Sequence, residues 1–195
     1  MSATFRKNRR GEVVVRLLPE ELTVLRGLPD ELRPLVEEPG LDTVSRVEIS
    51  DLTDDAASTE GADSTDLPKT VDDAVRRRLF PLAYLDPTEE DAEGEWQRMV
   101  HPELVRSKLE ALSLLAGTLQ RASETRGRVE IVLSPEETEA WLGALNDARL
   151  ALGVVLGVTE DLDLNAMSAD DPAAPGHAMY AWLTALQGAL VDALL

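Results

Sequence analysis

The sequence predicts an α+β fold that is mostly helical, a helical bundle with a small antiparallel sheet. Residues 13–17 (VVVRL) are rich in β-branched side chains, and the turn-forming segment 8–11 (NRRG) joins them to residues 4–6, which is the pattern of a β-hairpin. Residues 129–133 (VEIVL) predict one further strand. Most of the remaining chain carries apolar residues at helical spacing. We therefore expect the sheet to contain the N-terminal hairpin plus one strand near 129–133.

The first helix is expected to begin at Pro19. Proline suits the first helical position because its missing N–H would have no partner there, and Glu20 and Glu21 complement the positive end of the helix dipole. The leucines at positions 25, 28, 32 and 35 share one helical face. A proline inside a helix removes a backbone hydrogen bond, so we expect Pro29 to split this segment into two short helices.

The segment at about 42–70 is predicted to be a flexible acidic insertion. Its larger part, residues 50–70 (SDLTDDAASTEGADSTDLPKT), is rich in Asp, Ser, Thr, Ala and Gly and contains only two leucines. Such a composition buries too little apolar area to offset the entropy that is lost on ordering. We expect one domain over residues 1–195, interrupted by this insertion.

Five further helical stretches are expected after the insertion. Residues 71–80 predict a short helix, and a capping box at residues 86–89 opens the next one. His101 and Pro102 are expected to break the chain before a long amphipathic helix over residues 105–119. The last two helices follow the third strand. One opens at the capping box SPEE of residues 134–137 and carries an apolar stripe from position 141 to 155, and the other contains positions 182–193.

Two strand-to-helix segments of the sequence are similar. Residues 13–22 (VVVRLLPEEL) and residues 129–138 (VEIVLSPEET) each run from a strand through Pro-Glu-Glu into a helix. Either a shared local solution or an internal duplication explains this similarity, and we favour the local solution because only ten positions match. Both strands are then expected in the same small sheet.

Composition and charge exclude several classes of protein. The 195 residues include 37 Asp and Glu against 19 Lys and Arg, a formal net charge of -18, which disfavours broad contact with nucleic acid or an anionic membrane. There is no cysteine, so disulfides, thiolate metal sites and thiol redox chemistry are excluded from this chain. The sequence has no long apolar run and no signal-peptide stretch, so we expect a cytoplasmic protein without a transmembrane helix.

No catalytic, cofactor or metal motif is recognised. His101 and His177 lack partners at ligand spacing and are interpreted as helix-terminus residues. Neither a nucleophile elbow nor a phosphate-binding glycine loop occurs. Paired carboxylates such as Glu136 and Glu137 sit where they complement helix N-termini. We therefore expect no enzyme activity, no cofactor and no metal.

One concentrated basic feature lies on the N-terminal hairpin. It consists of Arg6, Lys7, Arg9 and Arg10. Such a hairpin tip can contact a phosphate backbone or an acidic protein surface. Charged side chains also protect a sheet edge from aggregation, and we favour this second interpretation because the net charge of the chain opposes DNA binding.

Polar residues interrupt an otherwise apolar helix between positions 141 and 157. Asn146, Asp147 and Arg149 are the three that stand out there. A buried polar group that lacks a hydrogen bond destabilises a protein by about 1–3 kcal/mol, so these side chains should have partners. They form either a buried network that fixes helix packing, which we favour, or part of a pocket for a partner or ligand.

The motifs WLxxLNDxRLxLGxxLGV over residues 141–158 and YxWLxxLQxxL over residues 180–190 are distinctive together. With RxLFPxAY over residues 77–84 and the opening strand before Pro-Glu-Glu-Leu, they resemble an uncharacterised actinobacterial family, the domain of unknown function two thousand and seventeen. The resemblance covers most of the chain outside the acidic insertion. By positional match, the signature residues are Trp141, Asn146, Asp147, Arg149, Trp182 and Gln187.

The resemblance implies a small cytosolic protein whose partners belong to the transcription or proteolysis machinery. Some members of the family are named transcriptional regulators linked to oxidative stress, with N-terminal cysteines as the sensor. This chain departs from them, since residues 2–10 (SATFRKNRR) contain no cysteine. A thiol switch therefore cannot operate in it, and any regulation must rest on protein contacts.

These observations favour a non-enzymatic cytosolic regulatory or adaptor protein that acts through protein–protein contacts. The final helix is apolar on more than one face, which fits either a buried helix or a homodimer surface. The alternative hypothesis is a DNA-associated transcriptional regulator that uses the basic N-terminal hairpin.

Overall fold

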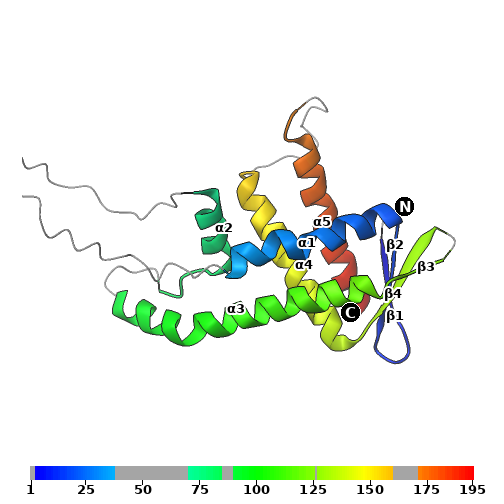
Figure 1. The fold of residues 1–195 in the computed structure, drawn as a ribbon, viewed down its shortest axis with the longest axis horizontal. Coiled ribbons are helices and arrows are strands. Elements are labelled where there is room, and N and C mark those ends of the chain that lie inside the picture. The colour runs from blue at the N-terminus through cyan, green and yellow to red at the C-terminus, as the bar shows by residue number, and fades with distance from the viewer. Residues whose placement is uncertain (1–2, 38–69, 85–89, 126, 160–170) are drawn as a thin grey trace, which may run out of the picture.

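The computed structural model describes residues 3–37, 70–84, 90–125, 127–159 and 171–195. Within these residues the chain is mostly helical, and a small antiparallel sheet lies at one end of the helices (Figure 1). This confirms the predicted α+β class. The predicted acidic insertion at about 42–70 falls almost entirely outside the described residues.

The sheet has four strands in the order β1-β2-β4-β3, and every neighbouring pair is antiparallel. β1 (Thr4–Lys7) and β2 (Val13–Leu17) form the predicted hairpin, and β4 (Arg128–Leu133) is the predicted further strand. β3 (Ser123–Thr125) was not predicted, because three residues are too few to show a β pattern. Gly127 has a φ of +73° in the connection between β3 and β4, a conformation that favours glycine.

One face of the sheet supplies part of the hydrophobic core. Val13 pairs with Leu133, Val15 with Ile131 and Leu17 with Val129, and all six side chains are buried. The residues between them are exposed or half-buried, so both central strands alternate between core and solvent. This alternation fixes the register, because a slip by one residue would expose the whole apolar set.

The helices are α1 (Pro19–Glu37), α2 (Val71–Leu79), α3 (Glu90–Gln120), α4 (Pro135–Val155) and α5 (Ala174–Leu194). α4 is central and packs against α2, α3 and α5, while α1 packs mainly on α3 (Figure 1). The fully buried Trp141 and Leu145 of α4 belong to the same core as leucines of α3 and α5. The position of α4 explains why its non-core residues face several neighbouring helices.

The predicted break at Pro29 is wrong, because α1 continues through both Pro29 and Pro34. An internal proline costs a helix about 3 kcal/mol. Here Pro29 is itself buried, between Leu25 at 0% and Leu32 at 3% exposure, so packing of this face holds the helix together.

The predicted break at His101 and Pro102 is also wrong, because both residues lie inside α3. Pro102 is exposed, so water can reach the backbone carbonyl that its ring leaves without a helical donor. His101 is therefore no helix-terminus residue, and its ring packs against that of Phe80 with 4.8 Å between centroids. The predicted capping box at residues 86–89 lies outside the described residues.

The two similar strand-to-helix segments use the same hydrogen bond. Glu21 accepts from the Leu18 backbone N–H at 2.8 Å, and Glu137 accepts from the Ser134 backbone N–H at 2.9 Å. In each case a glutamate in the first helical turn pairs with the backbone just before the helix. β2 and β4 are also neighbours in the sheet, as expected. The two segments therefore enter their helices from the sheet in the same way.

Candidate functional site

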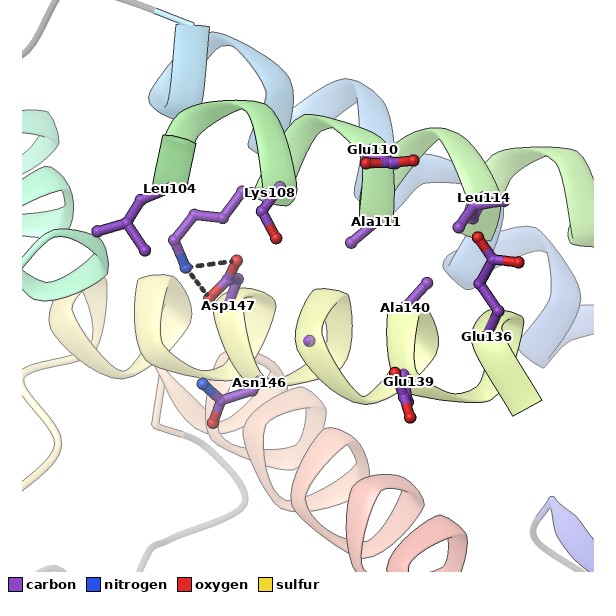
Figure 2. Close-up of a pocket in the computed structure, with 12 residues that line it drawn as sticks. Leu104, Lys108, Glu110, Ala111, Leu114, Glu136, Glu139, Ala140, Asn146 and Asp147 are labelled. Atoms are coloured by element: carbon purple, nitrogen blue, oxygen red, sulfur yellow. Dashed lines mark hydrogen bonds and ion pairs between the residues drawn. The ribbon is translucent and has the colours of Figure 1, made fainter. Parts of the chain in front are cut away.

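A polar groove of about 470 Å³ lies between α3 and α4 (Figure 2). Lys108 and Glu110 of α3 line one side, and Glu136, Glu139 and Asp147 of α4 line the other. Because four of these five charged side chains are carboxylates, the groove is acidic. We refer to it below as the polar groove.

Asp147 and Lys108 form the central ion pair of the polar groove. The Nζ atom of Lys108 lies 2.7 Å from Oδ1 and 2.9 Å from Oδ2 of Asp147, which is only 6% exposed. Burial raises the pKa of Asp147 above its ordinary value of 3.8, and the hydrogen bond and charge of Lys108 oppose this rise. Lys108 also lies 5.6 Å from the centroid of the Phe80 ring. The pair links α3 to α4.

The other two polar residues of this helix take a different direction. Asn146 lines the polar groove, but its side chain points away from α3 in Figure 2. Its Oδ1 accepts a hydrogen bond from Nη2 of Arg149 at 3.2 Å. The buried Nε of Arg149 has no hydrogen-bond partner among the described residues. The trio therefore does not form one network: Asp147 joins α3, whereas Asn146 and Arg149 pair along α4.

The signature residues are not gathered at one place. Trp141 is fully buried, and its Nε1 donates to Oγ1 of Thr118 at 2.7 Å, so its contacts are those of a core residue. The half-buried Trp182 donates from Nε1 to Glu21 at 3.3 Å, and Gln187 is half-buried on the same helix. Only Asn146 and Asp147 line the polar groove.

Two important residues were missed at the level of sequence. Lys108 is one of them. The sequence places this cation next to the apolar stripe of its helix, and such a position indicates a partner of opposite charge. Glu21 is the other, since it was interpreted only as a dipole-complementing acid. It accepts hydrogen bonds from Ala3 N at 3.1 Å, Leu18 N at 2.8 Å and the Trp182 indole, and so ties the N-terminus to α1 and α5.

The basic hairpin residues are displayed on the surface. Arg6, Lys7, Arg9 and Arg10 are all exposed, on β1 and in the turn that follows it. The Nζ atom of Lys7 donates to the backbone carbonyl of Leu194 at 3.3 Å, which links the hairpin to the end of α5. This surface is separate from the polar groove.

The part of the chain that the structure describes lacks two kinds of feature. It contains no group of three or more His, Cys, Asp or Glu residues arranged to hold a metal ion. None of its helices combines the length and the apolar character needed to cross a membrane. His177 contacts the Ala173 carbonyl through Nδ1 at 2.9 Å, at the start of α5.

Comparison with known proteins identifies relatives. The family model described as domain of unknown function (DUF2017) matches residues 1–194. The AosR homologue of Mycobacterium leprae (strain TN) is 37% identical over 135 residues, which cover 64% of this chain and 59% of that protein. Two further relatives are both named oxidative stress regulator AosR, one from Mycobacterium bovis (strain ATCC BAA-935 / AF2122/97) and one from Mycobacterium tuberculosis (strain ATCC 25618 / H37Rv). Each is 34% identical to this chain over 134 residues, which cover 63% of this chain and 59% of the relative. The chain thus spans about three fifths of the length of these relatives. No solved structure gives a significant match.

Proposed function

The chain belongs to the DUF2017 family, and from this premise we propose that it is a non-enzymatic regulatory or adaptor protein that acts through protein–protein contacts. The names of its curated relatives, which describe regulators of oxidative stress, support the regulatory part of the proposal. The chain contains no cysteine, so a partner-binding surface has to replace a thiol sensor within these 195 residues. By the family resemblance, we place the partner in the transcription or proteolysis machinery.

The observation that carries the proposal is the acidic character of the polar groove. Lys108 and Asp147 neutralise each other, so the charge offered to a partner comes from three other carboxylates. These are the exposed side chains of Glu110, Glu136 and Glu139. Charged side chains on an open surface steer and select a partner of opposite charge. The polar groove therefore suits a partner segment that carries lysine or arginine.

The test uses a glycine that lies in the groove. Gly143 is exposed on α4, lines the polar groove, and has nothing within 4 Å of an added Cβ. Gly143→Met should therefore fill the groove without disturbing the core. Gly188→Met on α5 is the matched control, because Gly188 is also an exposed helical glycine with open space around it and lies outside the groove.

The variants are compared in a strain that lacks the gene, by survival under peroxide and by quantitative mass spectrometry of proteins captured with the tagged chain. We expect wild type and Gly188→Met to restore survival and to capture the same partner. Gly143→Met should restore neither. Full complementation and unchanged capture by Gly143→Met would refute a role for the polar groove.

A DNA-associated regulator is the second candidate, favoured by the four exposed basic residues of the hairpin. It predicts DNA binding that weakens steeply with salt and is lost when Arg6, Lys7, Arg9 and Arg10 are changed to Ala. In that case Gly143→Met would bind DNA like wild type. Absent or salt-insensitive binding removes this candidate.

A further inference from the structure

An apolar groove, also of about 470 Å³, lies on another side of α4, between α4 and the helices α1, α2 and α5. Its walls include Leu28, Val75, Leu152 and Met179, one side chain from each of these four helices. We propose that this apolar groove binds an amphipathic, basic helix of a partner protein. The inference rests on the proposed function in that the occupant is a protein, but it assigns a surface separate from the polar groove.

The shape of the groove depends on a glycine. Gly27 of α1 is exposed, lines the groove, and has nothing within 4 Å of an added Cβ. Glycine inside a helix is less favourable than alanine by about 0.5–1 kcal/mol. The space that Gly27 leaves lets another chain approach the backbone of α1. Open apolar grooves of this kind receive the side chains that a helix presents at positions i, i+3 or i+4, and i+7.

One exposed apolar side chain lines the groove, and another lies next to a lining residue in the sequence. Val155, which lines it at the end of α4, is 59% exposed, and Val71, next to the lining residue Asp72, is 57% exposed. Single exposed apolar residues are ordinary on protein surfaces, but one that lines a groove is available to an occupant of that groove. Val155 thus offers exposed apolar surface to an occupant of the groove, and Val71 offers more one residue away from its lining.

The charges around the groove indicate the sign of its occupant. Glu31 of α1 and Asp72 of α2 both line the groove and are exposed. A second copy of this chain would bring a further formal charge of -18 against them, which opposes self-association. A small apolar molecule would leave both carboxylates without a partner. A helix with leucine-type residues on one face and lysine or arginine beside them satisfies both features.

The experiment measures binding of labelled synthetic peptides to the full chain by fluorescence anisotropy. The probe is a Leu and Lys peptide of about five helical turns, with leucines at positions i, i+3, i+4 and i+7. A peptide of the same composition with alternating leucines and a peptide with Glu in place of Lys are the comparison probes. We expect the patterned Lys peptide to bind most tightly to wild type and equally to Gly188→Met and Gly143→Met. Gly27→Met should weaken its binding about tenfold or more, as a blocked central pocket does.

A charge reversal provides a second variant that leaves the core untouched. Glu31→Lys combined with Asp72→Lys should weaken binding of the Lys peptide and strengthen binding of the Glu peptide. Unchanged binding to Gly27→Met, or equal binding of the patterned and alternating peptides, would overturn the proposal. Binding of only the small apolar dye anilinonaphthalene sulfonate, without the peptide, would also overturn it. The same holds if sedimentation shows that the wild type is a dimer and that Gly27→Met dissociates it. Because Gly143→Met reports on the polar groove alone, failure of the proposed function and failure of this inference give different results.

Discussion

Helix α4 carries two grooves of opposite character on different sides. Toward α3 it presents Asp147 and two exposed glutamates, whereas toward α1, α2 and α5 it presents Ala148, Ala151 and Leu152. Adjacent positions 147 and 148 thus line different grooves, because successive residues of a helix differ by about 100° in direction. These polar residues of α4 therefore line one groove, and these apolar residues line the other.

The same helix also shows how position decides the ionisation of a carboxylate. Burial raises the pKa of Asp147, in the middle of the helix, and Lys108 only partly offsets this. Burial also raises the pKa of Glu137, but hydrogen bonds from Ser134 and the contact with Arg121 outweigh it and lower this pKa below 4.5. At the helix N-terminus a carboxylate is stabilised by backbone donors, whereas in the helix middle it depends on one side chain.

The largest expected effect comes from a fully buried ring on α4, the helix that lines both grooves. Trp141→Ala should lower the free energy of unfolding by about 3–5 kcal/mol, because it removes a fully buried ring and leaves a cavity. Guanidinium unfolding measures this. Val132→Ala, at a 45% exposed position of β4, is the control and should have a far smaller effect. Similar losses in the two variants would mean that Trp141 is not central to the packing.

The ion pair in the polar groove should behave as a coupled unit. Asp147→Ala leaves the half-buried Lys108 without its counter-charge and should cost about 1–3 kcal/mol of unfolding free energy. Combining Asp147→Leu with Lys108→Met should recover most of that loss, because an apolar pair can replace a buried ion pair. Chemical denaturation of Asp147→Leu, Lys108→Met and the double variant tests this, and losses that add in the double variant would contradict the coupling.

The two carboxylates of α4 should respond oppositely to pH. Folded Asp147 binds a proton more tightly than the unfolded chain does, so its contribution to unfolding free energy is full below pH 3.8 and declines as pH rises through its raised pKa. The contribution of Glu137 is present above pH 4.5 and is lost as pH falls through its lowered pKa. Unfolding free energies of wild type, Asp147→Asn and Glu137→Gln, measured on both sides of the ordinary pKa values of 3.8 and 4.5, should show the two trends. Parallel trends would show that the environments do not differ.

The smallest expected effect concerns the glycines of the two grooves. Gly27→Ala and Gly143→Ala should each raise the free energy of unfolding by about 0.5–1 kcal/mol, because both positions are helical and have room for a Cβ. Thermal unfolding measures the gain. A gain in both variants would show that neither glycine is needed for stability. A loss in either variant would mean that there is no room for a Cβ atom at that position.

Local chemistry made much of the fold predictable. The hairpin and the Pro-Glu-Glu helix starts each depend on residues close together in sequence, and the structure has them where they were expected. The continuity of α1 through Pro29 was not predictable, because burial against distant elements decides it. The three-residue strand β3 was too short to be recognised.

The candidate site was predictable only in part. Asn146 and Asp147 stood out because they interrupt an apolar helix. The residues around them could not be predicted, because Lys108 is 39 positions away from Asp147 in the sequence. The apolar groove could not be predicted either, because it is formed by four separate helices. Contacts of this kind arise from packing, which periodicity along one helix does not encode.

The most direct test of the account is photocrosslinking from the polar groove in living cells. A photoreactive amino acid replaces Gly143, and the same amino acid at Gly188 on α5 serves as the control. The account predicts one reproducible crosslinked protein from position 143, absent from position 188 and lost when Glu136 and Glu139 are changed to Lys. Equal crosslinking from both positions, or none from position 143, would contradict the claim that this chain acts through a protein bound in the polar groove.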